Sequence, residues 1–564
     1  MTTSLRAFRR FDPSVLVWVA AVAIVGFLVL NPMGWLVSES FRDQTGAPTV
    51  GNYVAAFTDP SLIEPAANSL RLGVMVAVFS LLLAAPAAWA VARTNMPLRR
   101  TMRILILATF ATPGYLGALA WVLLASPRAG MINTLFRTLT GYEGTLFDIY
   151  SWPGIVLVST LYTYPLAFLL LNVALSAIPS DMEEAANVLG AGTVRTGFTV
   201  TLPLLLPAIM GASLLAFLDG VSDFGIPAVL GTPIGIQVLS TRIYRFFQFP
   251  FNRGAGAALG ILLLVVTGII LLVQRRVLGR RSYVTLTGKS GAQRRIDMGR
   301  WRYVLVGYCI GLVTLSLVLP YLVVIQASLS RAWSQGWTWA NFTLDNYRFV
   351  LVDFDLSRVS IVNSLKVSLV AATLAVVIAG AAAFVSARQL VRGHQVIAFA
   401  VVAPFVLPAI VLAVGVFFAY SRPPFFLYGT LLALIVAYVT KALPIAFVQS
   451  RAAILGVHPE LEEAARVLGA SSVRSFWDVT VPLVRPGLVG AWIVVLVLSL
   501  RELSSAIFLY TARTQVIGVT ILNFTNEGNI EWAAVMGVAM LAATFLVLVV
   551  GYRLVGRNVL EVGS

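Results

Sequence analysis

The feature that most constrains this chain is a series of about a dozen apolar runs, each close to the roughly 20 residues that a transmembrane helix needs. With 59% hydrophobic and only 11% charged residues among 564, the chain has too few polar side chains to cover a soluble body of this size. The pattern predicts an all-α integral membrane protein with about 12 transmembrane helices. The expected spans lie near residues 15–37, 69–91, 102–125, 153–177, 203–220, 254–274, 304–327, 365–387, 396–420, 428–450, 486–508 and 532–554.

The positions of the basic residues predict the orientation of these spans. Most of the 40 Lys and Arg residues fall into segments that are cytoplasmic if the N-terminus is cytoplasmic. The largest group lies in a linker near 275–303, and others follow the second, eighth and twelfth spans: Arg93, Arg99, Arg100, Arg388, Arg392, Arg553 and Arg557. By the positive-inside rule, both termini are expected in the cytoplasm. The net charge of +16 then reflects orientation, and we expect no nucleic-acid partner.

The N-terminus and the few reactive residues bear on whether the chain has a cleaved signal, a disulfide, a metal site or an ATP site. Three arginines precede the first run, which has no small-residue cleavage site, so we expect an uncleaved first span. Cys309 is the single cysteine, which excludes an intramolecular disulfide, and the two histidines fall in cytoplasmic segments. Gly288-Lys289-Ser290 resembles the end of a phosphate-binding loop, but the first glycine and the preceding strand are missing. We therefore expect no cofactor, no tightly bound metal and no ATP site in this chain.

The two halves of the chain contain an internal duplication. Residues 183–191 read Glu-Glu-Ala-Ala-Asn-Val-Leu-Gly-Ala, and residues 462–470 read Glu-Glu-Ala-Ala-Arg-Val-Leu-Gly-Ala. The same offset of 279 residues relates 200–203 to 479–482, so that Pro203 matches Pro482. Farther upstream, Asn68-Ser69-Leu70 matches Asn363-Ser364-Leu365. The repeat predicts two six-helix halves, residues 1–274 and 304–564, joined by the basic linker at 275–303, with equivalent cytoplasmic loops near 178–207 and 457–486.

Each of these loops predicts a short helix followed by a turn. Ser180 with Glu183 fits a capping box, and Pro459 suits the first turn of the second copy. Gly190 and Gly469 stand where a helix ends with positive φ. A helix this short needs a partner to be stable, and its small apolar face is expected to seat in a groove. The residues of this face are Ala185, Ala186, Leu189, Ala464, Ala465 and Leu468.

The motif resembles the EAA loop of type I ABC-importer permeases. Its pattern is Glu-Ala-Ala, three residues, Gly, nine residues, then aliphatic-x-aliphatic-Pro, and the second copy departs only in having Val481 where Leu is usual. The resemblance implies that each loop is a coupling helix seated on a cytoplasmic ATPase dimer, which alone hydrolyses ATP. It further implies an extracytoplasmic substrate-binding protein and a location in the bacterial inner membrane. The residues assigned to coupling are Glu183, Glu184, Ala185, Ala186, Gly190, Pro203, Glu462, Glu463, Ala464, Ala465, Gly469 and Pro482. The alternative is an ordinary amphipathic loop.

The substrate is less constrained than the class of protein. Fusion of two halves in one chain is similar to the ferric-iron permeases, and thiamine and 2-aminoethylphosphonate permeases are related alternatives. The segment Leu218–Gly225 also resembles the iron group. Outside this class, a secondary transporter with internal repeats is the main rival, but it predicts ion-coupling residues at mid-membrane rather than a duplicated cytoplasmic loop.

Three acidic residues suggest a cation path. Asp223 aligns with Glu502 by the repeat offset, and Asp219 lies one turn earlier. Because carboxylates in membrane spans tend to face a cavity or a partner, these residues are candidates for lining the outer mouth of a path for a hard cation. The alternatives are pairing with Arg501 and its neighbours, or docking of the binding protein. For Lys441 we expect snorkelling to the cytoplasmic side, with pairing to an acid or gating as alternatives.

Overall fold

The computed structural model describes residues 13–279, 295–336 and 338–555. Within these residues the backbone forms helices and turns, with isolated β-bridges as the only extended pairing. Ten helices are long and apolar enough to cross a membrane, and two bent helix pairs bring the total to 12. The predicted all-α membrane fold is confirmed. The Gly288-Lys289-Ser290 sequence and much of the basic linker lie outside the described residues.

Contacts divide the described residues into two compact units. Unit 1 holds residues 13–39, 359–516 and 542–555, and unit 2 holds residues 40–279, 295–336, 338–358 and 517–541. The first helix α1 thus belongs to the unit that contains the second copy of the loop motif, where Trp18 donates to Gly393 O at 3.0 Å. The division into two six-helix halves was predicted from the sequence repeat, and this division stays a prediction.

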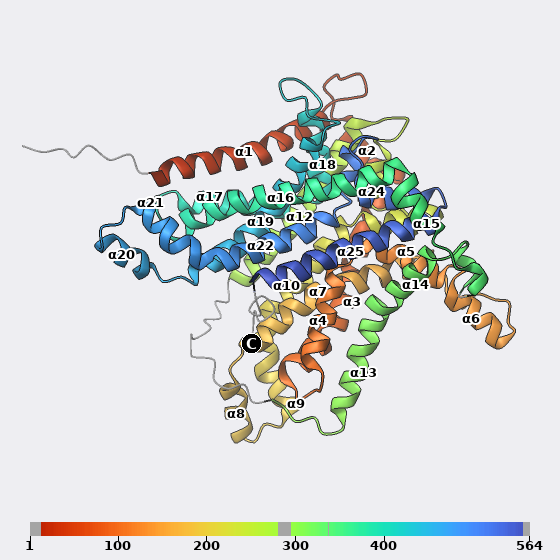
Figure 1. Ribbon diagram of the computed structural model, residues 1–564, viewed down its shortest axis with the longest axis horizontal. Helices are drawn as coiled ribbons and strands as arrows, with labels where there is room; N and C mark the ends of the chain where they lie inside the picture. Colours follow the sequence, from red (N-terminus) through yellow and green to blue (C-terminus); the bar gives the residue numbers. More distant parts are fainter. Residues whose placement is uncertain (1–12, 280–294, 337, 556–564) are drawn as a thin grey trace, which may run out of the picture. The chain divides into compact units, whose positions relative to one another are not determined.

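Unit 2 carries the first copy of the motif and is built around α3, α7 and α10 (Figure 1). Its α-helices are α2 (Gly51–Thr58), α3 (Pro60–Arg93), α4 (Arg99–Ala111), α5 (Gly114–Ala125), α6 (Met131–Thr140), α7 (Trp152–Ala177), α8 (Ser180–Val188), α9 (Thr193–Thr196), α10 (Leu202–Ser222), α11 (Leu239–Arg245), α12 (Arg253–Gly279), α13 (Trp301–Val313), α14 (Leu319–Ser328), α15 (Asp345–Arg348) and α24 (Ile517–Asn526). Small residues let α3 and α10 pack closely. A Cβ on Gly220 of α10 would lie only 3.1 Å from Gly73 Cα of α3.

Unit 1 carries the second copy, with α19 packed on α22. Its helices are α1 (Pro13–Ser40), α16 (Asp355–Ala387), α17 (His394–Val402), α18 (Ala409–Tyr420), α19 (Leu431–Leu455), α20 (Pro459–Val467), α21 (Ser472–Ser475), α22 (Val481–Leu500) and α23 (Ala506–Leu509), with a few terminal residues of α1 and α16 falling in the other unit. The last helix, α25 (Ile530–Val555), begins in unit 2 and ends in unit 1. Gly487 of α22 lets this pair approach closely, since a Cβ there would lie 2.4 Å from the Cβ of Ala453.

Two expected spans, near 102–125 and 396–420, are broken rather than continuous. α4 and α5 meet at an angle of 99°, and residues 394–406 meet α18 at 105°. Each break precedes a proline, Pro113 or Pro408, and the residue before a proline is disfavoured in helical conformation. Thr112 and Leu407 are accordingly extended, with ψ of 128° and 115°. Two copies of the same break show that it is part of the repeated design.

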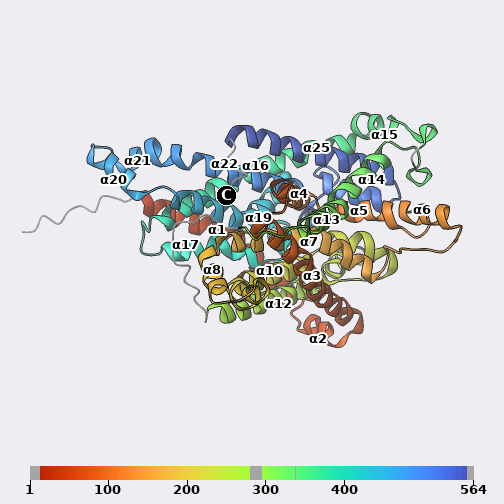
Figure 2. The same cartoon turned by 90° about the horizontal axis from the view of Figure 1, so that it is seen from below.

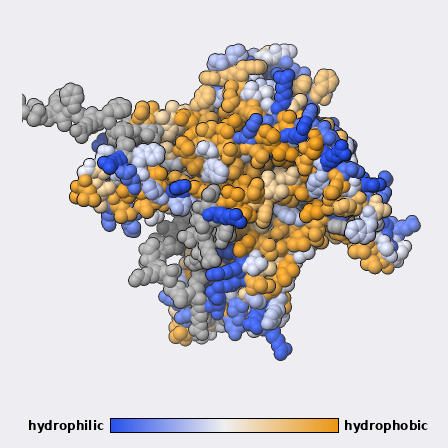
Figure 3. Space-filling model, viewed as in Figure 1, coloured by the Kyte–Doolittle hydropathy of each residue, from blue (hydrophilic) through white to orange (hydrophobic). Residues whose placement is uncertain are grey.

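Within each unit, the loop motif lies at one end of the long helices. In unit 2, α8 and α6 lie at opposite ends, and in unit 1, α20 and α21 project from one end (Figures 1 and 2). Hydrophobic side chains dominate the face seen in Figure 3, and hydrophilic side chains gather toward the helix ends. This distribution is typical of helices whose middle portions face lipid.

Candidate functional site

Both predicted loops form a short helix that ends at a left-handed glycine. α8 and α20 contain nine residues each. Gly190 has φ of +82° and Gly469 has φ of +94°, a conformation that residues with a Cβ rarely adopt. In each copy the amide after the glycine donates at 3.0 Å to the carbonyl five residues earlier, as in a Schellman motif. The expected turns are confirmed, and α20 begins at Pro459 as expected. The Ser180 side chain lies outside the described part.

The C-terminal end of each helix, with the residue that follows it, exposes a pair of large apolar side chains. Val188 and Leu189 are each 87% exposed, and Val467 and Leu468 are 87% and 88% exposed. The second glutamate of each motif, Glu184 or Glu463, is exposed as well. Ala185 and Ala464 are exposed, whereas Ala186 and Ala465 are partly covered. The two copies therefore present nearly the same apolar surface beside a carboxylate, which is the form of a docking site.

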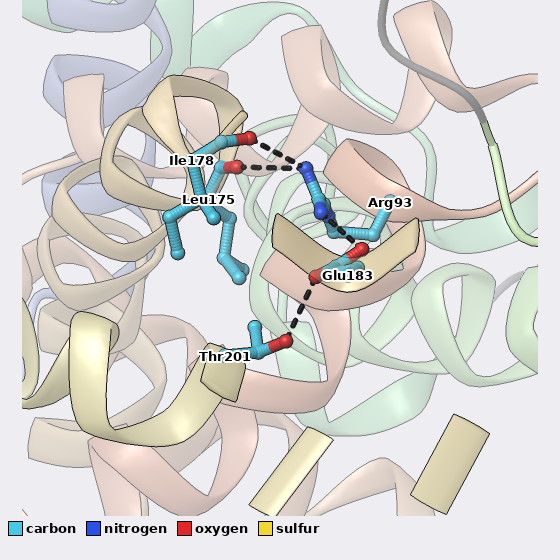
Figure 4. A network of polar contacts seen from close by, with 5 residues as sticks. All are labelled: Arg93, Leu175, Ile178, Glu183 and Thr201. Carbon is cyan, nitrogen blue, oxygen red and sulfur yellow. Dashed lines mark hydrogen bonds and ion pairs between the residues drawn. The ribbon is translucent and has the colours of Figure 1, made fainter. Parts of the chain in front are cut away.

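The first glutamate of the first motif turns inward to a buried arginine (Figure 4). Arg93, the last residue of α3, has a side chain only 2% exposed and forms an ion pair with Glu183. Its guanidinium also donates to Ile178 O at 3.0 Å and lies 3.5 Å from Leu175 O, both at the end of α7. Thr201 donates to the other oxygen of Glu183 at 2.8 Å. We call these five residues the first clamp.

The second motif has an equivalent arrangement. Arg388, directly after α16, is 6% exposed and its Nη2 lies 2.8 Å from Glu462 Oε1. Its Nε donates to the same carboxylate oxygen at 2.9 Å, and Nη2 donates to Val457 O at 3.0 Å. Val457 and Ile178 are equivalent by the repeat offset of 279 residues. We call Arg388, Glu462 and Val457 the second clamp.

The prolines of the motif mark where each chain enters its next long helix. α10 begins at Leu202 with Pro203 in its first turn, and α22 begins at Val481 with Pro482 in its first turn. A π-helical turn precedes each one, η1 (Gly197–Thr201) and η9 (Phe476–Thr480). Proline in the first turn needs no amide partner, so the entry is compatible with a continuous helix.

Sequence reasoning missed the two clamp arginines. Arg93 and Arg388 counted only as charges that orient the spans. A signal was nevertheless present, because the offset of 295 residues that relates Asn68 to Asn363 also relates Arg93 to Arg388. The capping role expected for Glu183 gave no hint of its ion pair, because that partner comes from a helix far away in the sequence.

The candidate path residues lie where α10 and α22 end. Asp219 is in the last turn of α10, and its carboxylate accepts a hydrogen bond from Thr163 of α7 at 2.6 Å. Asp223 follows the end of α10 and accepts from the amide of Gly225 at 3.0 Å. Glu502 follows the end of α22. Within the described residues, no three His, Cys, Asp or Glu side chains lie close enough to hold a metal ion.

The expectation that Lys441 snorkels to the cytoplasmic side is wrong. Lys441 of α19 forms an ion pair with Glu502, whose side chain is only 9% exposed. A buried carboxylate without a counter-charge is costly, and the ammonium group of Lys441 supplies that counter-charge. The amide of Ser505 donates to the other oxygen of Glu502 at 2.9 Å. The charge of Glu502 is therefore matched inside unit 1, which the repeat alignment with Asp223 did not predict.

The comparisons with known proteins identify the family. Residues 77–283 and 375–560 match the family described as "Binding-protein-dependent transport system inner membrane component". The chain is 27% identical to the ferric transport system permease protein FbpB of Actinobacillus pleuropneumoniae, over 92% of this chain and 75% of that protein. It is 28% identical to a putative ferric transport system permease protein FbpB 1 of Haemophilus influenzae, over 87% and 77%. It is 31% identical to the molybdenum transport system permease protein ModB of Escherichia coli, over 38% and 93%.

Proposed function

Because the chain belongs to the family of binding-protein-dependent transport system inner membrane components, we propose that α8 and α20 are its two coupling helices, each seated on an ATPase subunit. The chain is a multi-pass inner-membrane permease of an importer. The observation that carries the docking proposal is the duplicated surface of Val188, Leu189, Val467 and Leu468, which is exposed to nearly the same degree in both copies. Two equal surfaces fit a partner with two equal sites.

The orientation follows from the same proposal. The ends that carry α8 and α20 face the cytoplasm, so both termini are cytoplasmic and α6 lies on the outer side. An arginine in the last turn of each of α3, α12 and α25 supports this orientation. ATP hydrolysis occurs on the partner, and movement of the two coupling helices drives the permease between inward-open and outward-open states.

For the substrate we propose ferric iron delivered by an extracytoplasmic binding protein. Two relatives that cover most of this chain are named as ferric permeases, which supports this choice over thiamine or 2-aminoethylphosphonate. Asp219 and Asp223 supply oxygen atoms of the kind that a hard cation prefers. Glu502 contributes less negative charge to the path than the sequence suggested, since Lys441 balances it.

Reconstitution tests the proposal. Proteoliposomes that hold the chain, its ATPase and its binding protein are expected to take up radioactive ferric iron only in the presence of ATP. The ATP must be supplied on the side of the membrane where the ATPase is bound. ATP-independent uptake would overturn the importer mechanism. Uptake of a different solute with no uptake of iron would overturn the substrate alone.

The path residues are tested in the same system. The double variant Asp223→Asn with Glu502→Gln is expected to lower uptake at limiting substrate while leaving ATP hydrolysis in place. Unchanged uptake would remove these two residues from the path.

A further inference from the structure

One long helix in each unit carries a polar anchor at its C-terminal end and another about two turns inside its N-terminal end. The end near the coupling loop carries the clamp arginine, Arg93 on α3 or Arg388 after α16. The other end carries the asparagine of the repeated Asn-Ser pair. Asn68 donates to Gln237 O at 3.0 Å, and Asn363 donates to Gln515 O at 3.0 Å and Arg513 O at 3.1 Å.

The spacing of the anchors is the same in both units. Asn68 precedes Arg93 by 25 residues, and Asn363 precedes Arg388 by the same 25 residues. At 1.5 Å per residue, each helix joins points roughly 37 Å apart. That length is sufficient to cross the hydrocarbon core of a bilayer.

The asparagine anchors hold the segments that follow the candidate path carboxylates. In unit 2, Ser69 accepts from the amide of Leu239 at 2.7 Å, and Ser240 donates to the carbonyl of Asp223 at 2.6 Å. The chain from Asp223 to Ser240 is thereby tied to the N-terminal part of α3. In unit 1, the anchored carbonyls of Arg513 and Gln515 belong to the segment that follows Glu502.

From this arrangement we infer that α3 and α16 are connecting helices, which carry displacement of the coupling helices to the segments that follow Asp223 and Glu502. Arg93, Arg388, Asn68 and Asn363 are positioning residues in this inference, which rests on the proposed coupling function of α8 and α20. The two glutamates of each motif have different contacts. Glu183 and Glu462 form the ion pairs with the clamp arginines. Glu184 and Glu463 are exposed and remain available to the partner.

Burial explains why the clamp makes a firm connection. A guanidinium that is nearly inaccessible to water is costly unless its charge and its donors are matched. Arg93 and Arg388 are matched by one carboxylate and by carbonyl groups just before the coupling helix, where helix ends leave such groups without partners. If the loop moved away from the long helix, these groups would lose their hydrogen-bond partners or become exposed. The loop and the helix are therefore expected to move together.

The test uses the reconstituted complex of permease, ATPase and binding protein. The variants are Arg93→Gln, Arg388→Gln, Asn68→Leu and Asn363→Leu. Three quantities are measured for each: ATPase retained on purification, ATP hydrolysis, and iron taken up per ATP hydrolysed. The matched controls are Arg100→Gln and Arg392→Gln, since both arginines are exposed and lie close in sequence to the clamp arginines.

We expect each of the four variants to retain the ATPase and to lose about tenfold or more in uptake per ATP, within the usual range for coupled sites. The controls keep the wild-type ratio. Combining Arg388→Gln with Asn363→Leu lowers uptake per ATP no further than the stronger single variant does. Both substitutions interrupt the same connection through α16, so their effects do not add.

Several outcomes would overturn the inference. Wild-type uptake per ATP in an assembled Arg388→Gln or Asn363→Leu complex would do so, as would multiplied losses in the double variant. If the arginine variants fail to assemble, Asn68→Leu and Asn363→Leu decide alone, because their substitutions lie at the opposite helix end from the ATPase. Failure of the proposed function is distinguishable, since the wild-type complex would then show no ATP-dependent uptake.

Discussion

The two motif loops share an exposed short helix and a buried arginine clamp, and they differ in the further contacts that support the clamp. Exposed apolar pairs, left-handed glycines and arginine clamps occur in both. In the first loop, Thr201 completes the coordination of Glu183, whereas the equivalent Thr480 hydroxyl is buried and has no hydrogen-bond partner within the described residues. The hydrogen bond of Thr201 is thus a local feature of the first loop, whereas the exposed pairs, the glycine turns and the clamps are common to both.

The linker marks a second difference between the loops. The amide of Ile296 donates to Arg93 O at 2.9 Å, and Asn95 donates to Asp297 at 2.6 Å. The first clamp is thus supported by residues 296–297, whereas the second clamp's contacts among the described residues lie within unit 1.

The largest expected effect comes from reversing the charge of the outward glutamates. Glu184→Arg and Glu463→Arg are each expected to lower ATPase retention about tenfold or more, as for charge reversal in a docking surface. Because the two surfaces are equally exposed, the losses should be similar. Affinity measured by co-purification at rising ATPase concentration checks this, and loss from one variant alone would show that the loops are not equivalent docking sites.

The glycine turns come next in size. Gly190→Val and Gly469→Val place a β-branched side chain in left-handed backbone, at a cost of ~1–2 kcal/mol, and redirect the chain after the coupling helix. We expect membrane insertion to persist while ATP-dependent uptake is lost. Wild-type uptake from Gly469→Val would contradict the assigned role of the turn.

A smaller effect separates the two threonines. Thr201→Val removes a hydrogen bond to a carboxylate and is expected to cost about 1 kcal/mol. Thr480→Val removes a hydroxyl without a partner and is expected to be neutral or slightly stabilising. Thermal unfolding of the purified chain should show a lower Tm for the first variant only. Equal shifts would mean that the difference between the clamps has no energetic consequence.

The smallest effect concerns the contact between Asn95 and Asp297 in the linker, for which the second loop has no equivalent among the described residues. The amide of Gly299 and the side chain of Asn95 lower the pKa of Asp297 below its ordinary value of 3.8. A lowered pKa means that the stabilisation is present above the ordinary value and is lost as pH falls through the lowered value. Because Asp297 is exposed, Asp297→Ala should raise protease sensitivity near residue 297 slightly without changing uptake. A large loss of uptake would place the linker in the coupling route.

Much of the fold follows from local patterns in the sequence. Long apolar runs predict the spans, and the glycines of the duplicated motif predict the left-handed turns. The breaks before Pro113 and Pro408 had a local signal as well, since the preceding residues avoid helical conformation. The clamps and the Lys441–Glu502 pair could not be derived in this way, because each joins side chains from helices far apart in sequence. The placement of α1 with residues 359–516 depends on packing, which periodicity does not encode.

The central claim is that both loops dock the same partner, and site-directed cross-linking tests it most directly. Cys309 is the single cysteine and is buried, so a Cys309→Ser background leaves introduced cysteines as the only reactive thiols. Leu189→Cys and Leu468→Cys are each expected to cross-link to the ATPase subunit in the assembled complex. Leu135→Cys on α6, at the opposite end of its unit, is expected not to react with it (Figure 1). Cross-linking from neither coupling position, or equally from the α6 control, would contradict this account.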